Sequence, residues 1–247
     1  MSVAGFYRLI SVLLSLFLIS FLVSCDDKDD KNNDDMSEDD NNTNSYEALS
    51  DGSFENWKAH TEGEVSYEVP ESEWWGSLNM LKTLGCPLTM TKTTDAYNGN
   101  FAVKIETINW GDELIIPGII AAGYFDENQN IGENLLLGRD FEKKPDLIKG
   151  YFKYFPADQD TAILYSNLTK YNSETGIRDT IAEGNISVTD SITDYSIFEI
   201  TYDYYITDQI PDTINVVFLT SISGQDFKGH IGSTLFIDDV ELVYIDK

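Results

Sequence analysis

Short segments in which apolar and polar residues alternate recur from Ser45 to the end of the chain, with turn residues between them. The clearest is Phe101–Thr107, which follows Asn98-Gly99, a pair typical of a hairpin turn with two positive φ angles. Alternation of this period is the pattern of a half-buried β-strand. No stretch of ten residues in this region carries a helical stripe, so the pattern predicts an all-β fold.

We expect further strands at Thr161–Leu168, Gly184–Val188, Ser196–Ile206 and Ile214–Ser221. Many strands joined by loops in about 200 residues are typical of one two-sheet sandwich, here a jelly roll over residues 46–247. Ile115–Phe125 is rich in Gly, Ala and Pro and fits this pattern poorly. Together with Asp126–Gly138 it is expected to form a long irregular excursion over one face.

The last expected strand has an unusual acidic interruption. A glycine-rich turn from Gly229 leads into an apolar segment that ends at Tyr244, and Asp238-Asp239 lies within it. Because acidic residues disfavour strands, this pair needs a partner. The partner is either solvent at a sheet edge or a hard cation held by oxygen ligands.

Residues 1–24 have the features of a signal peptide. The apolar run Leu9–Val23 has 15 residues, which is too short for a membrane-spanning helix. Its ending, Leu22-Val23-Ser24-Cys25, resembles the bacterial lipobox, which implies cleavage before Cys25 and lipidation of that cysteine. The alternative is a plain secreted protein in which this cysteine is incidental.

Residues 25–45 are expected to form a disordered acidic tether. Residues 26–40 hold nine acids and two lysines, and little in the segment is apolar enough to bury. This run resembles the surface-export signal of Bacteroidetes lipoproteins, which implies an outer-membrane protein that faces outward; a spacer in the periplasm is the alternative. The net charge of −27 disfavours nucleic acid and anionic lipid as partners, so we expect contact with the membrane through the lipid anchor only.

Five segments in order resemble the putative carbohydrate metabolism domain of Bacteroides lipoproteins. The segments are Ser53–Trp57, Trp74–Asn79, Gly99–Lys104, Pro145–Tyr154 and Gly232–Val240, and the resemblance covers about residues 50–245. It implies a jelly-roll sandwich and, by the family's name, a role with carbohydrate. More distantly, the two ends are similar to carbohydrate-binding modules of the galactose-binding type.

The second resemblance implies a structural calcium ion. In such modules a Glu near the first strand, carbonyls of a turn and an Asp of the last strand hold calcium, which accepts six to eight oxygen ligands. The matching positions are Glu55, Asn98, Asn100, Asp238 and Asp239. The alternative is that Glu55 and Asp239 only face solvent.

Sugar recognition requires flat aromatic faces and planar polar groups, and five residues are candidates. They are Trp74, Trp75, Asn79, Trp110 and Lys153. Neighbouring tryptophans of a strand point to opposite faces, so one of the Trp74-Trp75 pair should lie in the core. Each of the five also has an ordinary structural explanation, because tryptophan fills sandwich cores and a lysine can simply be solvated.

Enzyme signatures are absent from the sequence. The two histidines, His60 and His230, are far apart, and no Gly-x-Ser-x-Gly turn or phosphate loop is present. Glu71 with Glu73 and Asp112 with Glu113 are weak candidates for a glycosidase carboxylate pair. We therefore expect a surface lipoprotein that binds a glycan without turning it over. The alternatives are a structural partner of a surface assembly or adhesin and, less favoured, a glycan-active enzyme.

Overall fold

The computed structural model describes residues 44–111, 114–125, 135–223 and 229–246, which form β-strands and one short 3-10 helix. The first half of the fold contains β1 (Ser45–Ala48), β2 (Trp57–Glu62), β3 (Val65–Pro70), β4 (Trp75–Ser77), the helix η1 (Leu78–Leu84), β5 (Met90–Thr93), β6 (Ala102–Glu106), β7 (Ile108–Trp110), β8 (Leu114–Ile116) and β9 (Ile119–Phe125). The second half contains β10 (Leu135–Leu137), β11 (Arg139–Asp140), β12 (Leu147–Phe155), β13 (Ala162–Asn172), β14 (Ile177–Val188), β15 (Ile192–Thr201), β16 (Asp203–Tyr204), β17 (Thr213–Leu219) and β18 (Thr234–Tyr244).

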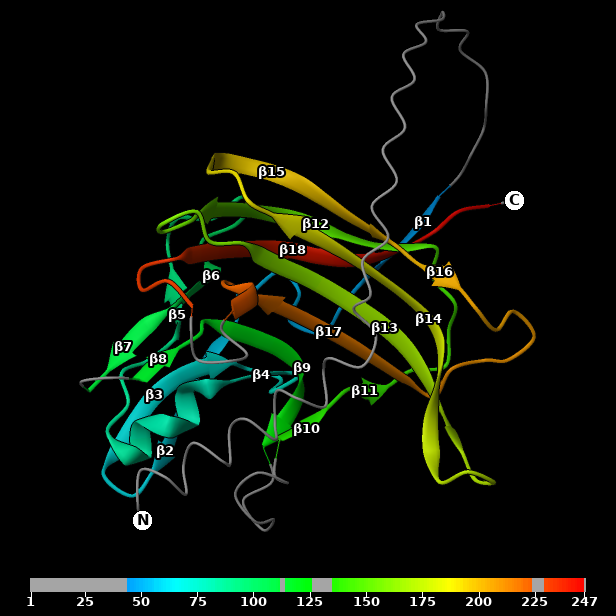
Figure 1. Cartoon of the computed structure of the whole chain (residues 1–247), viewed down its shortest axis with the longest axis horizontal. Helices are drawn as coiled ribbons and strands as arrows, with labels where there is room; N and C mark the ends of the chain where they lie inside the picture. Colours follow the sequence, from blue (N-terminus) through cyan, green and yellow to red (C-terminus); the bar gives the residue numbers. More distant parts are fainter. Residues whose placement is uncertain (1–43, 112–113, 126–134, 224–228, 247) are drawn as a thin grey trace, which may run out of the picture.

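Two antiparallel sheets face each other (Figure 1). The six-stranded sheet has the order β15-β12-β18-β6-β5, with β1 also paired to β18. The eight-stranded sheet has the order β10-β9-β17-β13-β14-β16, with β11 paired to β17 and β4 to β9. Hairpins β2–β3 and β7–β8 lie outside these sheets. This arrangement confirms the predicted jelly-roll sandwich.

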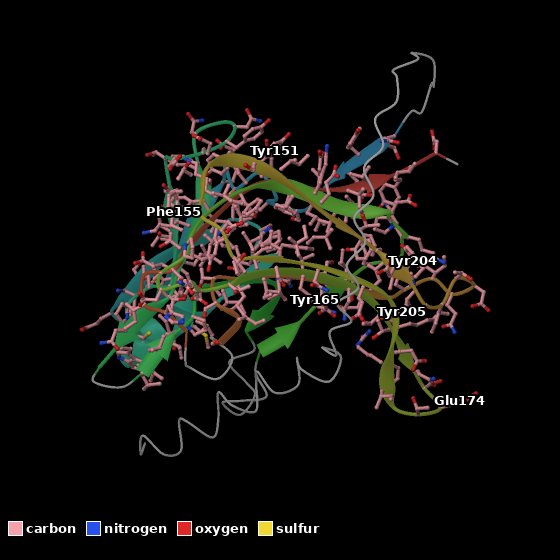
Figure 2. The ribbon with its side chains drawn as sticks, turned by 45° about the horizontal axis from the view of Figure 1, so that its top comes forward. Tyr151, Phe155, Tyr165, Glu174, Tyr204 and Tyr205 are labelled. Atoms are coloured by element: carbon pink, nitrogen blue, oxygen red, sulfur yellow. The ribbon has the colours of Figure 1, made fainter. Side chains whose placement is uncertain are left out.

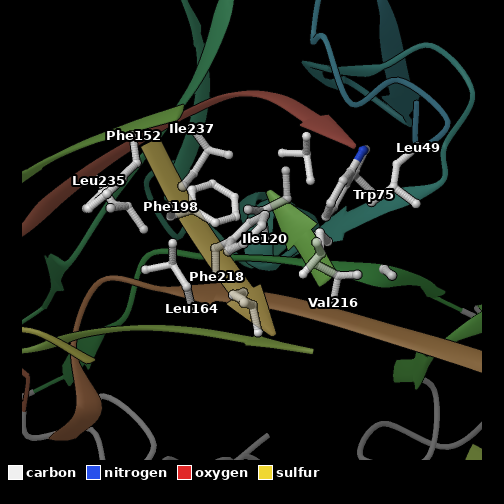
Figure 3. Packing of buried hydrophobic residues seen from close by; sticks show 14 of the residues in the cluster. Leu49, Trp75, Ile120, Phe152, Leu164, Phe198, Val216, Phe218, Leu235 and Ile237 are labelled. Atoms are coloured by element: carbon white, nitrogen blue, oxygen red, sulfur yellow. The ribbon is translucent and has the colours of Figure 1, made fainter. Parts of the chain in front are cut away.

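Alternate residues of the two sheets meet in one core (Figure 3). Phe152 and Phe198 of the six-stranded sheet lie against Phe218 and Leu164 of the other sheet. The Phe198 and Phe218 rings meet edge to face with centroids 5.5 Å apart, a preferred aromatic geometry. The core thus lies between the two sheets, as the predicted two-sheet sandwich requires.

The excursion predicted over Ile115–Phe125 is wrong, because this segment contains β8 and the central strand β9. β9 pairs with β17 on one side and with β4 and β10 on the other. Its small residues are weak strand formers in isolation, but Ala121 and Ala122 are buried by their neighbours. Of the predicted loop Asp126–Gly138, residues 126–134 lie outside the described residues.

The acidic interruption of the last strand is a β-bulge in the middle of a sheet. β18 lies between β12 and β6, so the alternative in which the acidic pair faces solvent at a sheet edge is wrong. The register between β12 and β18 shifts between Lys149 and Tyr151, and Asp239 has a φ of 47°. A left-handed residue within a bulge lets the strand resume its alternation, so Val240 and Leu242 return to the core.

The predictions for residues 1–24 and for most of the tether fall outside the described residues. Within the part of the chain that is described, no helix is long and apolar enough to cross a membrane.

Candidate functional site

The Trp74-Trp75 pair contributes mainly to the core. Trp75 is 3% exposed, lies on Phe218 with ring centroids 5.8 Å apart, and donates its indole N–H to the Ser50 carbonyl at 3.0 Å. Trp74 is half-buried and meets Trp75 edge-on at 4.6 Å. One tryptophan of the pair is thus a core residue, as expected.

Asn79 and Trp110 also have structural surroundings. Asn79 is 1% exposed, and its amide donates to the Met90 carbonyl and accepts from the backbone N–H groups of Thr89 and Met90. It therefore fixes the entry to β5. Trp110 is half-buried against a small cluster around Ile116. We do not include Trp75 and Asn79 in a ligand site, because the protein occupies their polar atoms.

Lys153 lies in the other sheet, away from these residues. It points outward from β12, and its ammonium group is 2.6 Å from Asp95 Oδ1. The same group lies 4.5 Å from the centroid of the Tyr195 ring. The five predicted ligand residues therefore do not converge on one site.

The residues predicted to hold calcium do come together, but through hydrogen bonds to the turn. Glu55 Oε1 accepts from the backbone N–H groups of Asn100 at 2.8 Å and Phe101 at 2.9 Å. Asp238 Oδ2 accepts from the backbone N–H groups of Tyr97 at 2.8 Å and Asn98 at 3.1 Å. The turn thus presents N–H donors to both carboxylates.

This arrangement does not fit a calcium ion, because calcium requires several oxygen ligands directed at one point, whereas the turn directs N–H groups at the two carboxylates. Among the residues described, no group of three or more His, Cys, Asp or Glu side chains is placed to hold a metal. Asp238 is buried, and this burial raises its pKa to about 6 although three backbone N–H groups donate to it. Burial opposes ionisation of Glu55 as well, but its hydrogen bonds from Phe101 and Asn100 hold its pKa below the ordinary value. Calcium binding itself stays a prediction.

The outward face of the eight-stranded sheet carries a more concentrated set of polar groups. We call this surface the β13–β17 face and define it by the outward residues of β17, β13 and β14. Cross-strand pairing arranges them in three rows: Asn215–Asn167–Glu183, Val217–Tyr165–Asn185 and Leu219–Ile163–Ser187. The face therefore changes from polar at one end to apolar at the other.

Hydrogen bonds hold the polar row in place. Asn215 donates its amide to Asn167 Oδ1 at 2.7 Å. The two carboxylate oxygens of Glu183 accept from different tyrosines, Tyr165 at 3.2 Å and Tyr205 at 2.9 Å. Burial raises the pKa of Tyr165, and the bond to Glu183 raises that of Tyr205, so both hydroxyls stay neutral donors.

The apolar end is a separate cluster on the outside of the sheet. Ile163, Tyr165 and Leu219 are buried there, with the partly buried Ile119 of β9 beside them. Figure 1 shows β13 and β14 bending together away from the six-stranded sheet, so this face lies on the inner side of the bend. Figure 2 shows Tyr165 and Tyr205 on this sheet, and Tyr151 and Phe155 on the opposite one.

A charged group flanks the polar row. Arg178 forms an ion pair with Asp212 at 2.5 Å, and the same guanidinium lies 3.4 Å from Thr169 Oγ1. Burial opposes ionisation of Asp212, but hydrogen bonds from Tyr171, Arg178 and Thr213 hold its pKa below the ordinary value. The pair is therefore ionised at neutral pH and adds little net charge to the face.

Comparison with known protein families identifies the family to which this sandwich belongs. The family model described as "Putative carbohydrate metabolism domain" (PCMD) matches residues 45–243, which span most of the chain. The chain belongs to this family. The match begins at the first residue of β1 and ends one residue before the end of β18, so it spans the sandwich.

Two solved structures share the fold of this PCMD protein. One, from Bacteroides thetaiotaomicron and described as a putative glycoside hydrolase, is 20% identical with a TM-score of 0.62, over 82% of this chain and 71% of that one. The other, from Bacteroides vulgatus and described in the same words, is 20% identical with a TM-score of 0.64, over 78% of this chain and 97% of that one. At this identity the likeness shows the fold alone. The chain matches no curated protein.

The β13–β17 face of the PCMD domain escaped the sequence analysis. The strands that carry it were predicted, but the aromatic ligand residues were expected to be tryptophans. The face instead uses Tyr165, Asn167 and Asn215. The available signal was one asparagine within each of two apolar strand segments, Asn167 in Thr161–Leu168 and Asn215 in Ile214–Ser221. Their meeting depends on strand register, which the sequence does not specify.

Proposed function

We propose that this PCMD protein is a glycan-binding module and that the β13–β17 face is its binding surface. The observation that supports it most is the hydrogen-bonded row Asn215–Asn167–Glu183, whose side chains are only partly buried on the outward face of the sheet. Sugar hydroxyls lie around the plane of the ring, and planar amides and a carboxylate suit them. The buried Ile163 and Leu219 support this end of the sheet beside the row.

The polar row is preorganised for such a ligand. An asparagine side chain can take part in up to four hydrogen bonds, so the single bond between Asn215 and Asn167 fixes both amides and leaves capacity for hydroxyls. Preorganised groups lose less entropy on binding. A neutral glycan is the matching class, because Glu183 would repel an anionic one and Arg178 is already paired with Asp212.

Binding rather than catalysis is part of the proposal. A glycosidase acid needs a raised pKa, whereas the hydrogen bond from Lys58 holds the pKa of Glu73 below its ordinary value. Asp112 and Glu113 lie outside the described residues. Incubation with the polysaccharide that is bound, followed by measurement of released reducing ends, tests this part. Release that depends on Glu183 or Glu73 would reassign the protein as an enzyme.

The binding experiment is affinity electrophoresis of the purified protein through gels that contain xylan, galactan, galactomannan, laminarin or hydroxyethylcellulose. Asn167→Ala and Asn215→Ala should each weaken retention by about tenfold in affinity, as expected for one lost hydrogen-bonding group of about 1.4 kcal/mol. Asn56→Ala, an exposed asparagine outside this face, is the matched control. Unchanged retention of folded Asn167→Ala and Asn215→Ala variants would reject this face.

The location of the protein is a further part of the proposal. We propose that Cys25 is lipidated and that the acidic tether carries the domain to the outer face of the outer membrane. The lipobox-like ending and the acids at residues 26–40 support this. Metabolic labelling with radioactive palmitate should mark the wild type and spare Cys25→Ser. Digestion of intact cells with protease should then separate a surface protein, which is cut, from a periplasmic one, which is protected.

A structural role in a surface assembly is the competing proposal. It has some support in the β13–β14 hairpin, where Tyr171 and Ile177 are exposed near the tip. Loss of binding to a surface protein in Ile177→Asp, with no glycan retention by the wild type, would favour it.

A further inference from the structure

We propose that the outward face of the six-stranded sheet is a second glycan-binding surface, built on an aromatic platform. The platform consists of Tyr97, Tyr151, Phe155, Phe236 and the aliphatic carbons of Lys153. Its proposed ligand, a neutral glycan, rests on the proposed function, but the platform lies on the other sheet from the β13–β17 face. The protein would thereby contact two glycan segments, one on each side of the sandwich.

The platform is assembled from neighbouring positions of β12 and β18. Tyr151 pairs with Asp238, Lys153 with Phe236, and Phe155 lies one outward position further along. The Phe155 and Phe236 rings meet edge-on with centroids 5.9 Å apart. An outward sheet face is ordinarily polar, so the rings of Tyr151 and Phe155 on either side of Lys153, with Phe236 across from that lysine, need an explanation.

A turn places the fifth residue on top of this face. The Tyr97 ring lies on the Tyr151 ring with centroids 3.4 Å apart and planes inclined by 10°. The turn is held by Asp238, which accepts the Tyr97 N–H at 2.8 Å, and by the Tyr195 hydroxyl, which donates to the Asp95 carbonyl at 2.6 Å. Tyr97 is thus fixed before any ligand arrives, which lowers the entropy lost on binding.

The rings are accessible. Phe155 is 37% exposed and Tyr97 is 45% exposed, so parts of both rings face solvent. If these rings served only to pack the turn against the sheet, complete burial would stabilise the fold most, because each exposed part of a ring forgoes hydrophobic stabilisation. Figure 2 shows Tyr151 and Phe155 along the outer side of their sheet, opposite Tyr165.

Charge complementarity indicates which ligand fits. Each lysine beside the rings is paired with an acid, Lys153 with Asp95 and Lys104 with Glu106, both at 2.6 Å. Paired charges offer adjacent donors and acceptors without attracting a net charge. Sugar hydroxyls can donate to the carboxylates and accept from the ammonium groups while C–H groups lie on the rings. An apolar protein surface would instead leave these charges desolvated.

The test is affinity electrophoresis against the same five polysaccharides, with Phe155→Ala and Tyr97→Ala. Loss of one platform ring should weaken affinity by about five- to tenfold. Tyr46→Ala is the matched control. Tyr46 lies in β1 of the same sheet and is 55% exposed, but its ring contacts Lys149, outside the platform. Far-ultraviolet circular dichroism and melting temperature verify that each variant is folded.

The outcomes separate the two surfaces. Weaker retention of both ring variants, with Tyr46→Ala unchanged, supports the second surface. Wild-type retention of both ring variants, together with loss in Asn167→Ala, overturns it and leaves the proposed function intact. Loss in the ring variants with no effect of Asn167→Ala or Asn215→Ala would retain this surface and reject the β13–β17 face. No retention of the wild type on any of the five polysaccharides would overturn both.

Discussion

Glu55 Oε1 lies 2.8 Å from the backbone nitrogen of Asn100, a contact between residues 45 positions apart in the chain. The same oxygen accepts the Phe101 N–H, and Asp238 holds the preceding residues of the turn in the same way. Two carboxylates thus connect the beginning and the end of the sandwich to one turn. Backbone N–H groups of the turn make this connection by direct hydrogen bonds to both carboxylates.

Glu55→Gln should therefore destabilise the protein by about 2 kcal/mol, since a neutral amide oxygen accepts these hydrogen bonds more weakly and the new amide N–H group faces the Asn100 Nδ2 donor. Thermal unfolding with added CaCl2 or with EDTA should give the same melting temperature for the wild type. Glu64→Gln, an exposed glutamate, serves as the control. A melting temperature that rises with calcium in the wild type, but not in Glu55→Gln, would instead establish the calcium site.

Gly99→Ala should be more harmful than an ordinary glycine substitution at positive φ. Gly99 has a φ of 68°, and an added Cβ would lie 2.3 Å from Glu55 Oε1. Gly63, with a φ of 59° and no atom within 4 Å of its Cβ position, is the matched control. Gly63→Ala should cost about 1 kcal/mol from backbone strain, and Gly99→Ala should cost clearly more in urea unfolding. Equal costs would show that the turn simply moves away from Glu55.

The pKa of Asp238, which burial raises to about 6, predicts a specific dependence of stability on pH. Since an unfolded aspartate titrates near 3.9, the native state binds more protons between about pH 4 and 6. The free energy of unfolding should therefore fall as pH rises through this window, by at most about 1.4 kcal/mol per pH unit from this one group. Stability is highest, as far as Asp238 is concerned, below the unfolded pKa.

Comparison of the wild type with Asp238→Asn isolates this effect, because asparagine does not titrate. The wild type should lose stability relative to Asp238→Asn as pH rises from 4 to 7 in urea unfolding. A relative gain with rising pH would mean that the N–H groups of Tyr97, Asn98 and Asp239 outweigh burial and lower the pKa.

The fold was more predictable from the sequence than the site. Segments such as Phe101–Thr107 and Thr161–Leu168 are rich in apolar residues because most of their side chains are buried, so their composition indicated strands directly. β9 was not predicted because it contains Ala and Gly, which are weak strand formers. These small residues fit the close packing of β9 between β17 and β4, which the local sequence pattern does not show. The bulge at Asp239 was visible only as an anomaly of composition.

The site depends on pairings between distant strands. Asn167 and Asn215 are 48 positions apart, and Tyr97 reaches Tyr151 only because its turn folds over the sheet. The resemblance to carbohydrate-binding modules correctly selected Glu55 and Asp238 as partners of one turn. It could not say that the turn would present N–H groups instead of carbonyls, because this depends on backbone rotation at Gly99.

Asn79 was predicted to bind a ligand, and its contacts predict a structural effect instead. The side chain makes three hydrogen bonds to the backbone of Thr89 and Met90 from a site that is 1% exposed. Asn79→Ala leaves these buried groups without partners, so it should cost about 3 kcal/mol or more in urea unfolding. Polysaccharide retention of the variant that remains folded should equal that of the wild type. Weaker retention at unchanged stability would return Asn79 to the binding surface.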